Sequence, residues 1–302
     1  MEQQNKKVFS RIGIAMFLMT LVVNVVQSIM MGVIYVVAPT FQESTWYVYS
    51  LIIVSFYLIG APLFYLLVKK LPAAPKKDRN SLKIHQILCL LVICLGTLYI
   101  FNMIGMVINY LIGSLIGNIN LNPLSTMIGG TDLLPTILIV GIASPIVEEL
   151  VFRKVLLERL RNYGDVIAIL VSGLCFGFYH GNISQFLYAS ALGFIFAYVA
   201  IRTEDIRYTI VLHILVNVIG TGIFPQLVTM GTTATMCIGL IVIVAIALTI
   251  LFFILAIAKK KLTFEKGNID LERPFQTVWL NVGMILFVLI SIASFAIVLF
   301  SM

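Results

Sequence analysis

The sequence predicts an all-α protein that crosses a membrane several times. Hydrophobic residues make up 61% of its 302 residues and charged residues only 11%, a composition far from that of a soluble domain. Several apolar runs reach or exceed the roughly 20 residues that a helix needs to cross a bilayer. The basic residues are confined to alternate connections between these runs, which is the pattern of a polytopic membrane protein.

Nine apolar membrane segments are predicted in chain order. They are residues 12–38, 47–68, 84–113, 133–153, 165–180, 184–201, 207–224, 234–258 and 276–301. The first and third are longer than a straight crossing requires, so we expect them to tilt or to extend beyond the membrane. The first follows a basic start as a signal peptide does, but it is too long for one, and we expect it to be retained.

The distribution of basic residues predicts the orientation of the chain. All 20 Lys and Arg lie before segment one, between two and three, after four, at the join of six and seven, or between eight and nine. By the positive-inside rule this side is cytoplasmic, with the N-terminus inside and the C-terminus outside. We expect an integral protein of a bacterial plasma membrane. The net charge of +7 then reflects orientation and contact with membrane lipids, and nucleic acid is excluded as a partner.

A polar stretch separates the third and fourth segments. Residues 114–131 are rich in Asn and Gly, which predicts a surface loop. Asp132 is placed to cap the next helix at its N-terminus. Pro135 falls in the first turn, where proline is tolerated.

Charged residues inside or beside the fourth segment indicate a functional site. A charge near the bilayer centre costs roughly 3 to more than 10 kcal/mol, so such residues usually face the protein interior. Glu149 and Arg153 are spaced i and i+4 with the acid first, the favourable order for an ion pair on a helix. Glu148 lies about 100° away around the helix. We therefore predict that Glu149 is structurally paired and that Glu148 is free for chemistry.

Further polar residues lie in the fifth and seventh segments. His180 closes the fifth segment, and His213 and Asn217 share one helix face at i and i+4 in the seventh. A single histidine inside a membrane is often only a hydrogen-bonding contact between helices. Together with the glutamates and Arg153, however, these residues make a purely structural role much less probable and indicate a polar functional site among segments four to seven.

Three short motifs occur in order on these segments: Glu148-Glu149-x-x-x-Arg153, Phe176-x-x-x-His180 and His213-x-x-x-Asn217. They resemble the motifs of the CPBP family, which includes CaaX prenyl endopeptidases and bacterial bacteriocin-processing or self-immunity (Abi) proteins. The resemblance covers about residues 133–222. It divides the chain into N-terminal membrane segments (1–132), a CPBP/Abi-like catalytic core (133–224) and two C-terminal spans (225–302).

The resemblance implies an intramembrane glutamic-type endopeptidase that acts without a metal. Glu148 would act as general base assisted by His180, and His213 and Asn217 would stabilise the oxyanion. Water attack on an amide does need a base and hydrogen-bond donors aimed at the developing negative charge. The residues that would hold the geometry of the site are Glu149, Arg153 and Phe176.

Three alternatives use the same residues. Glu148, His180 and His213 could bind zinc with an open fourth position, although their spacing is not His-Glu-x-x-His, so we expect no cofactor. The cavity of a non-enzymatic immunity or scaffold protein could hold a peptide. A transporter could use the intramembrane acids to carry protons, but no inverted repeat is visible in the sequence.

The depth of the motif residues poses a geometric problem. If the fifth segment crossed the membrane fully, His180 would lie far from Glu148 and His213. We therefore predict that segments five and six form a hairpin that turns inside the protein at Gly181-Asn182. The basic flank indicates a cavity opening toward the cytoplasm. The expected substrate is a peptide bond near a membrane-associated segment, either a lipid-anchored CaaX tail or a leader or pheromone peptide.

Overall fold

The computed structural model of the protein describes residues 2–75, 77–117 and 132–300, and the secondary structure of this part is entirely helical. Eight of its helices are long and apolar enough to cross a membrane. The protein is therefore a polytopic helical bundle, as predicted. The predicted loop 114–131 continues α4 at its start, and from residue 118 onward it lies outside the described residues.

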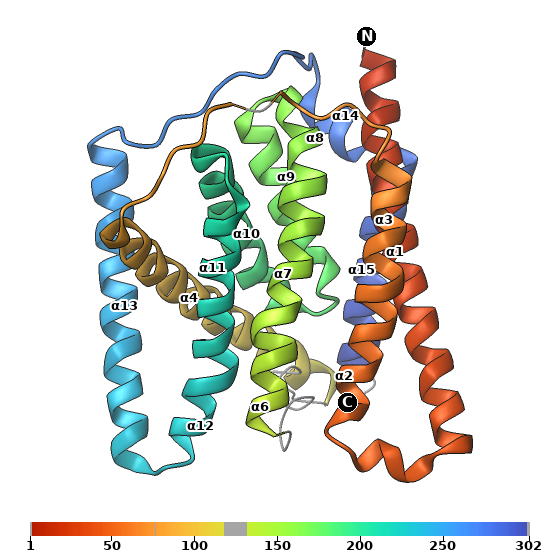
Figure 1. The fold of residues 1–302 in the computed structure, drawn as a ribbon, viewed down its shortest axis with the longest axis vertical. Coiled ribbons are helices and arrows are strands. Elements are labelled where there is room, and N and C mark those ends of the chain that lie inside the picture. Colours follow the sequence, from red (N-terminus) through yellow and green to blue (C-terminus); the bar gives the residue numbers. More distant parts are fainter. Residues whose placement is uncertain (1, 76, 118–131, 301–302) are drawn as a thin grey trace.

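Three long rods form the N-terminal part (Figure 1). They are α1 (Glu2–Val37), the joined helices α2 (Trp46–Ile52) and α3 (Ala61–Val68) with π-helical turns at Ile53–Gly60 between them, and α4 (Ile84–Ile116). In Figure 1, α4 crosses the bundle obliquely, which is the tilt predicted for the third segment. The first rod starts well before its apolar run and so extends beyond it.

The central part contains two broken rods and a helical hairpin. The rods are α6 (Leu133–Thr136), α7 (Ser144–Glu149) and α8 (Glu158–Leu160), linked by π-helical turns, and α11 (Ile206–Asn217) followed by α12 (Phe224–Val228). The hairpin consists of α9 (Asp165–Tyr179) and α10 (Ile183–Thr203). Three helices follow, namely α13 (Thr232–Ala258), α14 (Pro274–Trp279) and α15 (Val282–Phe300).

The hairpin turns inside the bundle, which confirms that prediction. With 15 residues, α9 is about 22 Å long at 1.5 Å per residue, short of the roughly 30 Å of a bilayer core. The connection between α9 and α10 lies near mid-height of the bundle (Figure 1). Gly181 has a φ of +71°, which glycine adopts without strain. The side chain of Asn182 is buried and accepts a hydrogen bond from the backbone N–H of Gln185 at 2.9 Å.

Two local predictions need correction. The ninth segment is interrupted, because Asn281 separates α14 from α15. Its amide donates to the carbonyls of Thr277 and Val278, and its oxygen accepts from the N–H of Met284. At the start of α6, Asp132 occupies the N-cap position, but its carboxylate accepts from Thr45 Oγ1 at 3.1 Å instead of capping the helix. The hydrogen-bond partners of Asn281 and Asp132 could not be predicted from the local sequence pattern.

Helices α1 and α15 run side by side and are held together by a close glycine contact. A Cβ on Gly283 would lie 1.8 Å from the backbone oxygen of Ser10, and one on Gly13 would lie 2.2 Å from the nitrogen of Met284. Further along, Asn24 Nδ2 donates to Ser294 Oγ at 3.4 Å. This pairing fixes the position of α1 relative to the C-terminal helix.

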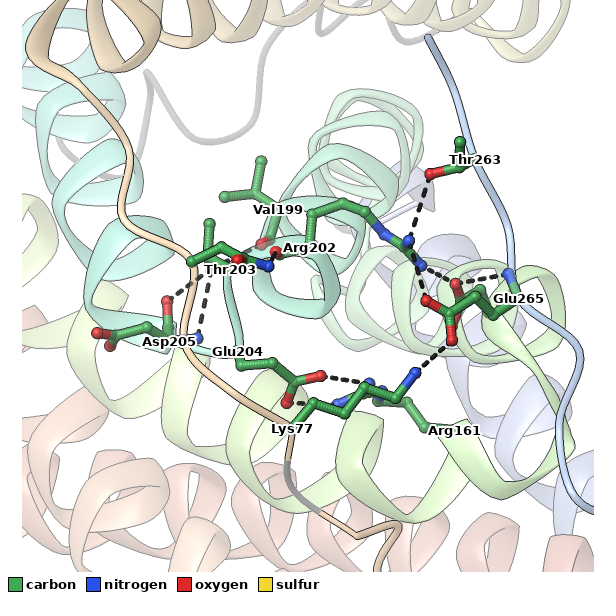
Figure 2. Close-up of polar contacts among 11 residues, drawn as sticks. Lys77, Arg161, Val199, Arg202, Thr203, Glu204, Asp205, Thr263 and Glu265 are labelled. Carbon is green, nitrogen blue, oxygen red and sulfur yellow. Dashed lines mark hydrogen bonds and ion pairs between the residues drawn. The ribbon is translucent and has the colours of Figure 1, made fainter. Parts of the chain in front are cut away.

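The connections that carry the basic residues gather at one end of the bundle, at the top of Figure 1. We call this the basic end; α1 ends and α2 begins at the opposite end. Figure 2 shows the polar contacts there, where Lys77 and Arg202 pair with Glu265 and Arg161 pairs with Glu204. The pairs of Glu265 with Lys77 and Arg202 hold the segment 259–273 in place.

Candidate active site

A buried ion pair lies at the centre of the site, as predicted. Glu149 and Arg153 have fully buried side chains, with 3.3 Å between Arg153 Nε and Glu149 Oε2. The guanidinium carbon lies 4.5 Å from the ring centroid of Phe176 and 5.5 Å from that of Phe196. These ring faces attract the cation where water is absent. The pair is therefore held by its own charges and by aromatic walls.

His213 lies between the two glutamates. Its Nδ1 is 3.0 Å from Glu149 Oε1, and its Nε2 is 3.6 Å from Glu148 Oε2. A carboxylate can only accept, so Nδ1 carries the proton shared with Glu149. The rings of Phe176 and Phe196 pack against the imidazole at centroid distances of 5.7 and 5.0 Å. Glu149 thus fixes both Arg153 and the orientation of His213.

Glu148 is the less constrained of the two glutamates. Its side chain is 13% exposed, whereas that of Glu149 is fully buried. Glu148 lines a cavity of about 550 Å³. This difference is the one predicted from the helix positions of the two residues.

His180 ends α9, where the hairpin turn exposes its ring to the same cavity. Its Nδ1 lies 2.7 Å from the carbonyl oxygen of Phe176. The carbonyl only accepts, so Nδ1 bears the hydrogen and Nε2 keeps its lone pair. The ring can therefore accept a hydrogen bond from a water molecule in the cavity.

Asn217 lies one turn beyond His213 on α11 and also lines the cavity. Its Nδ2 donates to the carbonyl of Val140 at 3.1 Å. An amide group has two N–H donors, so one remains for a bound molecule. The cavity is thus lined by all four residues predicted to be catalytic, Glu148, His180, His213 and Asn217.

The cavity extends in a direction that the sequence analysis predicted wrongly. It was expected to open toward the cytoplasm, that is, toward the basic end. The exposed residues of its wall instead lie on α1 and α15 toward the opposite end, and they include Asn24, Ser28, Met31 and Ile297. On the basic side, the fully buried side chains of Phe152 and Arg153 close the site.

The structure adds residues that the motifs did not indicate. Tyr57 and Ser144 share a hydrogen bond of 2.5 Å near Glu148, and either hydroxyl can donate. A polar face of α1 lines the cavity as well. The signal available in the sequence was the presence of polar residues inside apolar spans, and sequence reasoning did not connect them to the motifs.

A metal site was a sequence-level alternative. Among residues 2–75, 77–117 and 132–300, no group of three or more His, Cys, Asp or Glu side chains is arranged to hold a metal ion. Glu148, His180 and His213 do face one cavity.

The fold and this site define an integral membrane protein with a buried carboxylate, histidine and asparagine cavity. Residues 130–219 match the model of the family described as type II CAAX prenyl endopeptidase Rce1-like. The chain is 34% identical over 82 residues to the "Putative membrane peptidase YdiL" of Bacillus subtilis (strain 168), which covers 27% of this chain and 34% of that protein. No solved structure matches the chain.

The matched segment is similar to the CAAX protease (CPBP) family, the resemblance that the motifs predicted. It contains α6 to α11 and every predicted site residue. The chain spans about a third of the length of the curated relative. The helices α1 to α4 and α12 to α15 lie outside the matched segment.

Proposed function

We propose that the protein is an intramembrane endopeptidase that hydrolyses a peptide bond near a membrane-associated segment, with water activated by Glu148 and His180. The observation that carries the proposal is the convergence of Glu148, His180, His213 and Asn217 on one cavity of about 550 Å³. The size falls within the roughly 300–1,000 Å³ of ligand sites. The match to a membrane protease family supports the same reaction class.

In the proposed reaction, Glu148 removes a proton from water while His180 Nε2 accepts a hydrogen bond that orients it. The oxygen of the water then attacks the carbonyl carbon and forms a tetrahedral intermediate. Glu148 passes the proton to the leaving nitrogen, the C–N bond breaks, and a carboxyl and an amino product remain. Every atom of the products comes from the peptide and one water molecule.

His213 and Asn217 are proposed to stabilise the oxyanion. Since Nδ1–H of His213 donates to Glu149, donation from Nε2 as well requires the imidazolium form. The cluster contains two acidic side chains, Glu148 and Glu149, and two basic ones, Arg153 and His213. A balanced cluster is cheaper to bury than one with an excess charge. The free N–H of Asn217 is the second donor.

The proposed setting follows from charge and fold. The basic end would face the cytoplasm of a bacterial plasma membrane, with the N-terminus inside and the C-terminus outside. The substrate would be a peptide or protein held at the membrane, with or without a lipid anchor, and no cofactor would be required.

The test compares wild-type protein with Glu148→Gln and Glu148→Ala, purified in detergent, against fluorogenic peptides with and without a lipid anchor. Loss of a general base should lower kcat by about 10²- to 10⁴-fold in both variants, while both keep the wild-type melting temperature. Wild-type activity in Glu148→Ala would end the assignment of Glu148 as base.

Two further outcomes separate the alternatives. Activity lost on treatment with a chelator and restored by zinc would indicate a metalloprotease that uses Glu148, His180 and His213. If wild type cleaves nothing while Glu148→Ala keeps the cellular phenotype, a non-enzymatic peptide-binding protein becomes the better interpretation.

A further inference from the structure

One face of α1 carries polar residues although the helix is otherwise apolar. Thr20, Asn24, Gln27 and Ser28 all line the cavity that contains Glu148, and their spacing places them on one side of the helix. The family match does not reach this helix, since it covers residues 130–219. We call these four residues the α1 wall.

The α1 wall is rich in hydrogen-bond acceptors. Asn24 Nδ2 donates to Ser294, and Gln27 Nε2 donates to Ser55 Oγ at 3.1 Å. With their amino groups so engaged, both amides keep a carbonyl oxygen as acceptor. The hydroxyl of Ser28 donates to the backbone oxygen of Asn24 and also keeps its acceptor capacity.

Thr20 lies deepest along the α1 wall and is 5% exposed. Its hydroxyl has no hydrogen-bond partner among the described residues, unlike Thr221 across the cavity, which donates to the oxygen of Asn217 at 2.6 Å. A buried hydroxyl without a partner is costly. Rotation about χ1 of Thr20 would exchange the positions of its hydroxyl and methyl groups. The hydroxyl could then form a hydrogen bond with a molecule bound in the cavity.

The repeat of the α1 wall fits an extended peptide. Thr20, Asn24 and Ser28 recur every four residues, which is about 6 Å along a helix. An extended chain presents N–H groups to the same side every two residues, about 6.6 Å apart. Backbone groups of a peptide inside a membrane need such partners, because no lipid group can replace water.

We propose that the α1 wall binds the backbone of an extended substrate segment and leads it to Glu148 from the end opposite the basic end. This inference rests on the proposed function for the identity of the reaction, but it concerns binding and can be measured without cleavage. The occupant is a peptide because the acceptors are neutral, spaced for successive N–H groups and continuous with the hydrolytic site.

The first experiment measures binding of fluorescein-labelled apolar peptides to the full chain in detergent, in a Glu148→Gln background that cannot turn them over. Asn24→Leu and Gln27→Met remove the acceptors at nearly constant size. Each should raise Kd by about two- to tenfold, the value of one hydrogen bond. In the Glu148-containing protein the same substitutions should raise KM and leave kcat nearly unchanged.

The matched control is Asn102→Leu, the same change in α4. Asn102 contacts Met106 Sδ at 3.8 Å and lies outside the cavity wall. It should leave Kd and KM at wild-type values. Melting temperatures of all variants, measured in the same detergent, exclude unfolding as the cause of weaker binding.

A second experiment asks whether the contact is to the peptide backbone. Peptides carrying a single N-methyl amide, moved one position at a time, should bind weakly when the methyl replaces an N–H that reaches the α1 wall. In Asn24→Leu that penalty should disappear at one position, which is the non-additivity of two groups in direct contact.

The outcomes separate this inference from the proposed function. Peptides that bind but are not cleaved, with binding weakened by Asn24→Leu, would support the α1 wall and contradict the peptidase. Cleavage with KM unaltered in both α1 variants, or no coupling with any N-methyl position, would overturn the α1 wall and leave the peptidase standing. Absence of both binding and cleavage would overturn both.

Discussion

The bundle holds charged pairs in two regions that differ in their access to water. In the candidate active site, the side chains of Glu149 and Arg153 are fully buried. At the basic end, Lys77 and Glu265 are each 53% exposed, and Arg161 and Glu204 lie between these extremes at 11% and 7%. Figure 2 shows the pairs of the basic end, which join separate connections of the chain.

The different access of water to the two regions affects how strongly their charged pairs are held. Water can replace a lost partner of Lys77 or Glu265, so this exposed pair is weak and easily exchanged. Water cannot reach Glu149 or Arg153, so each depends on the other, and both are fixed in position. A fixed carboxylate can orient His213, whereas an exposed one could not. The three predictions below test this contrast in order of decreasing effect.

The largest effect on stability is expected for Arg153→Met, which removes the guanidinium partner of the buried Glu149 carboxylate and leaves His213 as its partner. Removing one partner of a buried pair should cost about 3–5 kcal/mol, measured as a fall in melting temperature or as loss of folded protein. The double variant Glu149→Gln/Arg153→Met should regain most of that stability. It should still lack activity, because His213 loses the carboxylate that orients it. Equal destabilisation in the single and double variants would contradict the account.

An intermediate effect is expected for Glu204→Gln at the basic end. Arg161 holds both carboxylate oxygens of Glu204, at 2.8 and 2.5 Å. A glutamine keeps one acceptor but loses the charge, so the loss should be about 1–3 kcal/mol, seen in thermal unfolding. Arg161→Lys keeps the charge but not the paired geometry, and it should fall between Glu204→Gln and wild type. If Glu204→Gln destabilised the protein as much as Arg153→Met does, the proposed difference in strength between the two regions would be contradicted.

The smallest effect is expected for Lys77→Met, at most about 1 kcal/mol for an exposed pair. Lys77, with Arg202 beside it, holds the pKa of Glu265 below its usual 4.5. Because folding lowers this pKa, the contribution is present above the usual value and lost as the pH falls through the lowered one. The melting-temperature difference between wild type and Lys77→Met should therefore vanish in acid. A difference that persists when Glu265 is protonated would contradict this origin.

Much of the site could be predicted because its residues have unusual chemistry for their surroundings. Charged residues in an apolar run indicate a function because burying a charge in a membrane costs free energy. The i, i+4 spacing of Glu149 and Arg153 correctly predicted their ion pair. The in-protein turn at Gly181-Asn182 followed from the requirement that His180 meet Glu148. The contact of His213 with both glutamates could not be predicted, because it joins helices that are far apart in sequence.

The α1 wall and the direction of the cavity were also beyond the sequence. Thr20, Asn24, Gln27 and Ser28 are uncharged, so they cost little in a span and look like ordinary helix contacts. The basic flank suggested access from its own side. Packing closed that side with Phe152 and Arg153 and left the wall of α1 and α15 exposed instead.

The sequence by itself determined most of the membrane segments, the grouping of basic connections and the identity of the polar motif residues, since each depends on composition or local spacing. The tertiary structure alone decided which of those residues touch, where the cavity leads and which distant helices line it. The physical reason is that membrane-spanning helices are apolar on most sides, so the residue pattern of one helix gives little information about which other helix packs against it. Those contacts are set by shape, as where Gly283 lets α15 approach α1.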